Sequence, residues 1–242
     1  MKNQNIAYYN FIQSKHLSFK SKNEIKKKYH FVLDKIIKNI NNTKDIYHSL
    51  SDNYKFDINL KDLKKFNKYK TVVIIGMGGS ILGSKAIFNF FKNKMDKDFI
   101  FFDNLDENNL LKLKKQKNLQ KILFLVISKS GNTLETISNL IALKIIKKKS
   151  RNIIIISERN KSPLYLLSNK YNFFHIEHKK YIGGRYSVLT EPGIVPTILM
   201  GLNTKRLRKN ILLHFKSIKQ KFLRDSTLKI SDLLKKRKFK NI

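Results

Sequence analysis

Apolar runs of strand length alternate with helical stretches through the centre of this 242-residue chain, and this alternation strongly constrains its fold. The runs are Thr71–Ile75, Phe99–Phe102, Ile122–Ile127, Ile153–Ile156 and Phe173–Ile176. The stretches of helical period are Ile81–Phe91, Glu107–Lys115, Leu134–Ile146 and Pro163–Tyr171. Runs that are apolar at every position indicate strands buried on both faces. Strand, helix and strand in repeated order predict an α/β fold with a five-stranded parallel sheet flanked by helices.

The regions on either side of this centre are predicted to be helical. Lys22 to Asn39 shows the apolar stripe of an amphipathic helix, and Lys61 to Tyr69 is a shorter candidate. Val188 to Leu202 is a mixed apolar segment, and a Lys-rich helical tail follows from about Thr204 to Phe239. We therefore divide the chain into a helical N-terminal segment (1–69), a central domain (70–203) and a C-terminal helical tail (204–242).

The formal net charge of +34 raises the question of nucleic-acid binding. Only seven of the 51 basic residues are Arg, whereas base recognition and close phosphate contacts favour Arg. The lysines are spread along the whole chain, which indicates a solvated basic surface that binds nucleic acid only non-specifically. Cysteine is absent, and no apolar stretch approaches the roughly 20 residues that span a bilayer. With no secretory signal in residues 1–20, we expect a cytoplasmic protein without a membrane partner.

Two short loops each follow an apolar run and precede a helical stretch: Gly76 to Ser80 and Ser128 to Thr133. The unpaired N–H groups at a helix start stabilise anions such as phosphate. Glycines let the backbone approach a ligand closely, and the hydroxyl groups add donors. Two such loops on neighbouring strands therefore predict a phosphorylated small molecule as the ligand.

Two other phosphate-binding patterns, the dinucleotide fingerprint and the Walker motif, fit these loops less well. The first loop resembles a dinucleotide fingerprint, but Ile81 stands where the third glycine belongs, and no Walker pattern is present. Glu135, just after the second loop, is explained by stabilisation of the helix start.

Each of the six histidines is interpreted as structural because none has the spacing of a metal ligand. We expect neither a metal nor a cofactor.

A third motif, Gly183 to Ser187, contains Arg185. Its planar guanidinium suits an oxyanion or an enediolate, and the glycines allow a sharp turn. The alternative is a structural Arg that pairs with a carboxylate such as Glu191.

Four segments taken in order resemble the phosphoglucose isomerase family. They are Gly76 to Gly83, Asn104 to Asp106, Ser128 to Thr136 and Gly183 to Leu189. The resemblance covers roughly residues 70–203 and corresponds to the first sugar-isomerase (SIS) domain of that family, which is flavodoxin-like. It implies interconversion of glucose 6-phosphate and fructose 6-phosphate through a cis-enediolate, and a homodimer.

The resemblance also implies roles for individual residues. Arg185 is the family's arginine, which stabilises the enediolate. The residues that it assigns to binding the substrate are Gly79, Ser80, Ser128, Lys129, Ser130, Gly131, Asn132 and Thr133.

Family members carry a second SIS domain that supplies a Glu base, a His from across the dimer interface and a late Lys. Residues 192–242 contain no Glu, and Asp225, Asp232 and His214 match none of these positions. We therefore expect the first half of such an enzyme, with a divergent or truncated tail. Two alternatives stay open, a non-catalytic SIS module that binds sugar phosphates and a basic nucleic-acid-associated protein.

Overall fold

The computed structural model describes residues 23–115, 118–148, 150–215 and 219–235. Their contacts form two compact units, one of residues 43–209 and the other of the chain on either side of it. The first unit contains the sheet together with residues 43–69 and 204–209, so it extends beyond the region 70–203 that carries the motifs.

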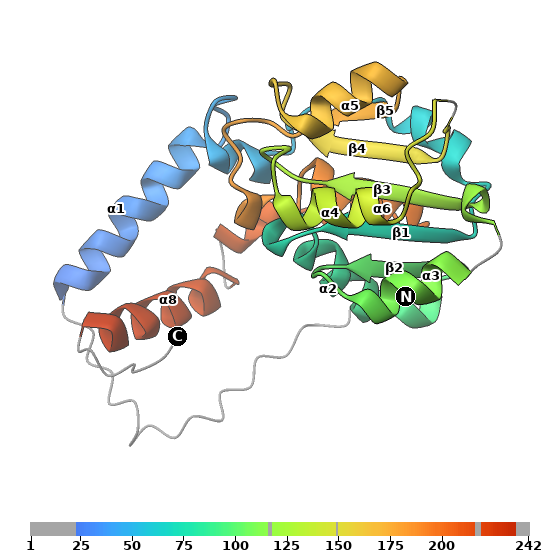
Figure 1. Cartoon of the computed structure of the whole chain (residues 1–242). Helices are drawn as coiled ribbons and strands as arrows, with labels where there is room; N and C mark the ends of the chain where they lie inside the picture. The colour runs from blue at the N-terminus through green and yellow to red at the C-terminus, as the bar shows by residue number, and fades with distance from the viewer. Residues whose placement is uncertain (1–22, 116–117, 149, 216–218, 236–242) are drawn as a thin grey trace. The chain divides into compact units, whose positions relative to one another are not determined.

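The predicted five-stranded parallel sheet is confirmed (Figure 1). Its strands are β1 (Thr71–Gly76), β2 (Asp98–Phe102), β3 (Ile122–Ile127), β4 (Ile153–Ser157) and β5 (Phe174–Glu177). They lie in the order β2-β1-β3-β4-β5, and every neighbouring pair is parallel. The chain therefore reverses its direction of travel across the sheet between β1 and β3, which is where ligands bind in folds of this kind.

Both faces of the sheet are covered, as the continuously apolar strands predict. Helices α2 (Leu82–Phe91) and α6 (Glu191–Leu199) cover one face together with the 3₁₀ segment Leu60–Phe66. Helices α3 (Glu107–Lys115), α4 (Leu134–Ala142) and α5 (Pro163–Tyr171) cover the other (Figure 1). Alternate residues of each central strand enter the two cores, for example Val72 and Ile74 one of them and Val73 and Ile75 the other.

Several predicted element ends are corrected. The third predicted helical stretch, Leu134–Ile146, ends as a helix at Ala142, because Lys144 takes the left-handed conformation with φ of 53°. Where an α-helix over Lys61 to Tyr69 is predicted, the structure has a 3₁₀ segment, Leu60–Phe66. The mixed apolar segment Val188 to Leu202 contains α6, a helix whose residues are buried except Ile198. Pro192 lies in its first turn, where a missing N–H costs nothing.

The second unit holds α1 (Asn23–Asn39), a 3₁₀ turn (Ile211–Phe215) and α8 (Lys219–Lys235). Helix α1 confirms the predicted amphipathic helix, and α1 contacts α8. The predicted helical tail is interrupted: α7 (Thr204–Arg208) ends where Lys209 becomes extended with ψ of 134°, and Asn210 then takes a positive φ of 65°. Residues 236–239 of that prediction lie outside the described residues. Across the described ranges, no helix is long and apolar enough to cross a membrane.

Candidate functional site

The two predicted phosphate loops begin side by side at the carboxyl edge of the sheet. Gly76 and Ile127, the last residues of β1 and β3, are paired in the parallel register. A Cβ added to Gly76 would lie 2.9 Å from the carbonyl oxygen of Ile127, so the strands approach closely only because residue 76 is glycine. Both loops therefore leave the sheet at the point where its strand order reverses.

The first loop forms a tight turn that leads into α2. The N–H of Ser80 donates to the carbonyl of Met77 at 3.1 Å, and Ser80 is buried. Gly78 takes a positive φ of 51°. Gly79 packs directly on the third motif, because a Cβ at this position would lie 2.3 Å from the carbonyl carbon and oxygen of Gly184. Only glycine allows this contact.

A hydrogen bond between two of its own side chains stabilises the second loop, Ser128 to Thr133. The side-chain oxygens of Ser128 and Thr133 are hydrogen-bonded at 2.8 Å, and Ser128 is buried. Gly131 has a φ of 69°, and a Cβ there would lie 2.1 Å from Oγ of Ser162. Thr133 is the N-cap residue of α4, but its hydroxyl makes no capping bond. The loop is therefore pre-shaped before any ligand arrives, and its hydroxyl pair lies at a helix start.

The remaining residues of this loop differ in their exposure. Ser130 and Asn132 are exposed, and Oγ of Ser130 accepts the N–H of Asn132 at 3.2 Å. Lys129 is half-buried, and its ammonium lies 3.7 Å from the carboxylate of Glu158. The positive charge of Lys129 is thus partly balanced by a carboxylate, whereas Ser130 and Asn132 present polar groups to solvent.

Arg185 lies in a 3₁₀ turn (Gly184–Tyr186) that packs on the first loop. Ser187 connects them, because its hydroxyl lies 2.7 Å from the carbonyl of Gly184 and 3.3 Å from that of Gly79. The Arg185 side chain is exposed, and no carboxylate in the described part of the chain forms a salt bridge with it. The alternative pairing with Glu191 is not what the structure contains.

Glu191 instead occupies a buried cluster that the sequence did not reveal. Its carboxylate accepts the hydroxyl of Tyr54 at 2.7 Å and the N–H of Asp57 at 2.9 Å. Burial raises the pKa of Glu191, against the effect of these two hydrogen bonds. The Asp57 carboxylate in turn accepts two hydrogen bonds from Arg159, at 3.0 and 2.9 Å, and the N–H of Glu177 at 2.8 Å. This cluster attaches residues 54–57 to α6 and to the end of β4.

Arg208 of α7 strengthens the same attachment. Its guanidinium donates to the carbonyls of Leu189 and Ser51, the latter at 2.8 Å, and lies over the Tyr54 ring at 5.3 Å. The only sequence signal for this role is indirect: Arg208 and Arg159 are two of the few arginines in a Lys-rich chain. These contacts attach residues 51–57 to the unit that contains the sheet.

Two of the histidines lie near the carboxyl edge. The ring of His175 is hydrogen-bonded to Ser157 at 3.0 Å, and burial lowers the pKa of His175 to about 4. Burial likewise lowers the pKa of His178 to about 4, and Nε2 of its ring has no hydrogen-bond partner within the described structure. Both rings are therefore neutral at pH 7. The side chain of His214 lies outside what the structure describes.

The structure thus brings the residues predicted from the sequence to one edge of the sheet. Gly79, Ser80 and Arg185 belong to two turns in contact, and Ser128 to Thr133 leave the adjacent strand. Backbone N–H groups, hydroxyls and an unpaired guanidinium can together hold a phosphate and stabilise a developing oxyanion. In the described parts of the chain, no three His, Asp or Glu side chains are grouped as metal ligands.

Comparison with curated proteins gives relatives of one kind. The chain is 36% identical over 156 residues to the glucose-6-phosphate isomerase of Methanocaldococcus jannaschii. This match covers 63% of this chain and 38% of the relative. It is 33% identical over 199 residues to the glucose-6-phosphate isomerase of Borreliella afzelii, covering 74% of this chain and 36% of the relative. The chain therefore matches little more than a third of the length of these relatives.

Solved structures give the same fold. A hypothetical protein from Thermus thermophilus has a TM-score of 0.66 at 21% identity, over 88% of this chain and 54% of that one. A glucose-6-phosphate isomerase from Chlamydia trachomatis has a TM-score of 0.51 at 26% identity, over 63% of this chain and 31% of that one. The family model for phosphoglucose isomerase matches residues 21–229. With the sheet order, the two strand-end loops and the Arg185 turn, this match shows that the chain belongs to the phosphoglucose isomerase family.

Proposed function

We propose that this chain supplies the sugar-phosphate site of a glucose-6-phosphate isomerase, which interconverts glucose 6-phosphate and fructose 6-phosphate. The observation that carries the proposal is the contact between Gly79 and Gly184. It places the Arg185 turn against the first loop, while the second loop begins on the adjacent strand. A phosphate ligand and a cation for the reacting carbons are then available at one sheet edge.

In this mechanism the Ser128 to Thr133 loop binds the phosphate dianion with N–H groups at the start of α4 and with hydroxyl groups. Ser80 and Gly79 bind neighbouring hydroxyls of the sugar. A base moves a proton between C2 and C1, and the oxygen of the resulting enediolate gains negative charge. The exposed guanidinium of Arg185 stabilises that charge, an interaction that strengthens as the transition state forms.

The loops and the Arg185 turn do not contain a proton-transfer base. Glu191 is unsuitable, because its carboxylate is fully buried and both of its oxygens accept hydrogen bonds. Glu158 lies beside Lys129, and Glu135 in the first turn of α4. We propose that the base belongs to a further domain or subunit, in accordance with the greater length of the relatives. Homodimerisation is likewise a proposal from the family resemblance.

The test combines calorimetric binding of fructose 6-phosphate with a coupled isomerase assay on the 242-residue chain. We expect fructose 6-phosphate to bind and unphosphorylated fructose not to bind. Failure of fructose 6-phosphate to bind would refute the proposed site. Turnover by this chain alone would contradict the proposal that the base comes from elsewhere, and Glu135 and Glu158 would be substituted next.

The second candidate function is a non-catalytic module that binds sugar phosphates. The buried position of Glu191 favours it, because this removes one of the acidic residues available as a base. Isomerase activity that arises on adding the part of a longer relative that this chain does not match would exclude it. Binding that persists with no activity under any such complementation would support it.

A further inference from the structure

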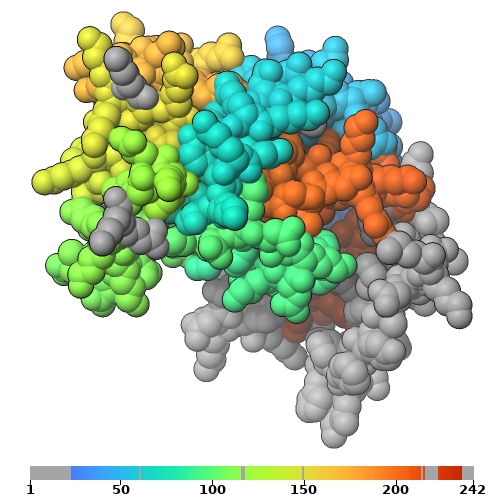
Figure 2. All heavy atoms as spheres, turned by 90° about the vertical axis from the view of Figure 1, so that its right-hand side faces the viewer, coloured from blue at the N-terminus to red at the C-terminus, as the bar shows by residue number. Residues whose placement is uncertain are grey.

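A hollow lies at the opposite, amino edge of the sheet, far from the loops of the proposed sugar-phosphate site. It has a volume of about 420 Å³, and the segments that precede β1, β3 and β4 form it. Figure 2 faces this edge and shows these three segments meeting there. Strand β1 alone has six residues, so about 20 Å separate the two edges. A ligand here would not touch the carboxyl-edge loops.

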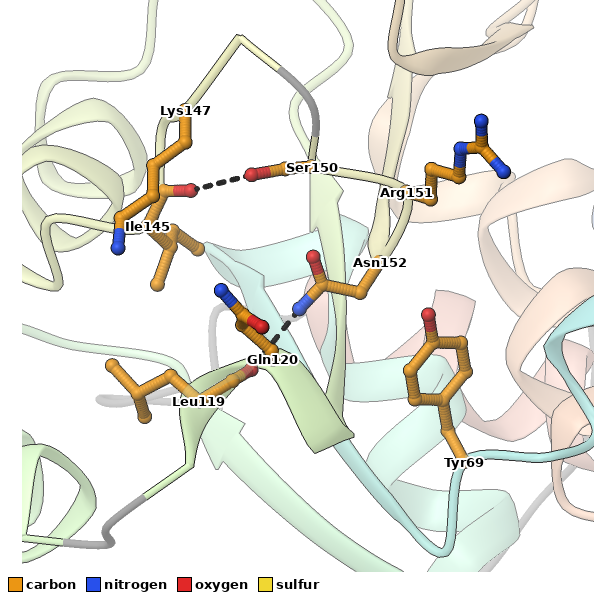
Figure 3. Close-up of a pocket in the computed structure, with 8 residues that line it drawn as sticks. All are labelled: Tyr69, Leu119, Gln120, Ile145, Lys147, Ser150, Arg151 and Asn152. Atoms are coloured by element: carbon orange, nitrogen blue, oxygen red, sulfur yellow. Dashed lines mark hydrogen bonds between the residues drawn. The ribbon is translucent and has the colours of Figure 1, made fainter.

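The floor of this hollow is fixed by hydrogen bonds. The side-chain amide of Asn152 donates to the carbonyls of Leu119 and Ile122, at 3.0 and 2.7 Å, and Asn152 is buried (Figure 3). The hydroxyl of Ser150 donates to the carbonyl of Ile145 at 3.2 Å. These bonds join the segment before β3 to the segment before β4 and close the turn from Ile145 to Ser150, so this part of the hollow has a defined shape without a ligand.

The walls combine apolar and cationic groups. In Figure 3 the ring of Tyr69 stands on one side, and the side chains of Leu119 and Ile145 stand on the other. Lys147 and Arg151 lie at the rim, and none of the described residues that line the hollow is acidic. Arg151 is exposed and forms no salt bridge within the described ranges. An uncompensated guanidinium next to a hollow favours an anionic ligand.

The basic character continues beyond Tyr69 and Gln120. A neighbouring hollow of about 600 Å³ shares these two residues and adds three lysines, Lys68, Lys70 and Lys121. No acidic side chain is among its described lining residues either. The volume of the first hollow falls in the range of small-ligand sites, and the second adds room and charge for an extended anionic group.

We propose that the amino edge is a binding site for a small organic phosphate with a planar apolar portion, such as a nucleotide. The planar portion lies between the Tyr69 ring and the side chains of Leu119 and Ile145. The phosphates contact Arg151 and the lysines towards Lys121. This site is separate from the proposed sugar-phosphate site and does not depend on it.

Calorimetry on the full chain tests the proposal with ATP, tripolyphosphate and adenosine, each at 150 and 300 mM salt. We expect ATP to bind at least tenfold more tightly than tripolyphosphate or adenosine. Arg151→Gln should weaken ATP binding at least fivefold, and Tyr69→Leu, which removes the aromatic ring, about threefold. The matched control is Lys205→Gln on α7, an exposed charge that lines neither hollow and should change binding less than twofold. Thermal unfolding of each variant checks that it is folded.

Several results would overturn the proposal. Equal affinity for tripolyphosphate and ATP, or equal effects of Arg151→Gln and Lys205→Gln, would indicate general attraction to a chain of net charge +34. Displacement of ATP by saturating fructose 6-phosphate would place ATP at the carboxyl edge instead. A single-stranded oligonucleotide and tripolyphosphate are also compared as competitors of ATP, at equal concentrations of phosphate groups. If the oligonucleotide displaces ATP at the lower concentration, the amino edge is a nucleic-acid site instead.

Discussion

Arg185 and Glu191 lie six positions apart in the sequence, and their surroundings are opposite. Arg185 is exposed, forms no salt bridge in the described structure and lies on a turn that contacts the first loop. Glu191 is fully buried, and its carboxylate accepts hydrogen bonds from Tyr54 and Asp57. A charged group left unpaired at a sheet edge is available to a ligand, whereas a buried and fully paired one holds the fold. The variants below separate these two roles.

The largest effect is expected from Glu191→Ala. The change leaves the buried hydroxyl of Tyr54 and the half-buried N–H of Asp57 without their acceptor, which should lower the free energy of unfolding by about 4 kcal/mol. Glu191→Gln keeps the shape and one acceptor, so we expect a loss of only about 1 kcal/mol. Urea unfolding measures both. Equal losses for the two variants would show that Glu191 stabilises the fold through its second carboxylate oxygen, which both changes remove, and not through its shape, which Glu191→Gln keeps.

A somewhat smaller effect is expected from pH through His178. Its folded pKa of about 4 lies below the ordinary value of 6.5, so below pH 6.5 the unfolded chain takes up the proton more readily than the fold. Stability should therefore be level above pH 6.5 and fall by about 3 kcal/mol towards pH 4 on account of this ring. His175 adds a loss of the same sign.

The measurement is urea unfolding at pH values from 4 to 8. His178→Gln should remove roughly half of the loss, whereas His30→Gln, on the exposed surface of α1, serves as the matched control. An unchanged pH profile in His178→Gln would mean that the buried ring is protonated with little cost.

Arg185→Ala should leave stability within about 0.5 kcal/mol, because the side chain is exposed. It should weaken binding of a sugar-acid phosphate, whose carboxylate resembles the enediolate, by about 2 kcal/mol. Fructose 6-phosphate itself should lose less, since its carbonyl is not yet charged. Arg185→Lys keeps the charge but not the planar guanidinium, so its affinity for the sugar-acid phosphate should lie between those of the unaltered chain and Arg185→Ala. Equal losses for both ligands would show that Arg185 binds substrate rather than the charge that develops during reaction.

The sequence predicted the sheet well, because strands buried on both faces must be apolar at every position, as Ile122 to Ile127 is. It predicted the loops because small and hydroxyl residues stand where strands end. It missed α6, since Pro192 and Pro196 count against a helix until burial of nearly the whole segment outweighs them. It missed the partners of Glu191 because Tyr54 lies 137 positions away, and no local pattern encodes such a contact.

The smallest effects concern the two serines of the second loop, where the contrast between exposed and buried groups recurs within three residues. Ser130 is exposed, so Ser130→Ala should weaken phosphate-ligand binding by about 1 kcal/mol and leave stability unchanged. The hydroxyl of Ser128 is buried against Thr133, so Ser128→Ala should lower stability and, by loosening the loop, binding by about 0.5–1.5 kcal/mol. Calorimetry with fructose 6-phosphate and with inorganic phosphate separates the two cases. If Ser130→Ala binds both ligands as tightly as the unaltered chain while Ser128→Ala does not, the loop acts through its shape, and its exposed hydroxyl takes no part in holding phosphate.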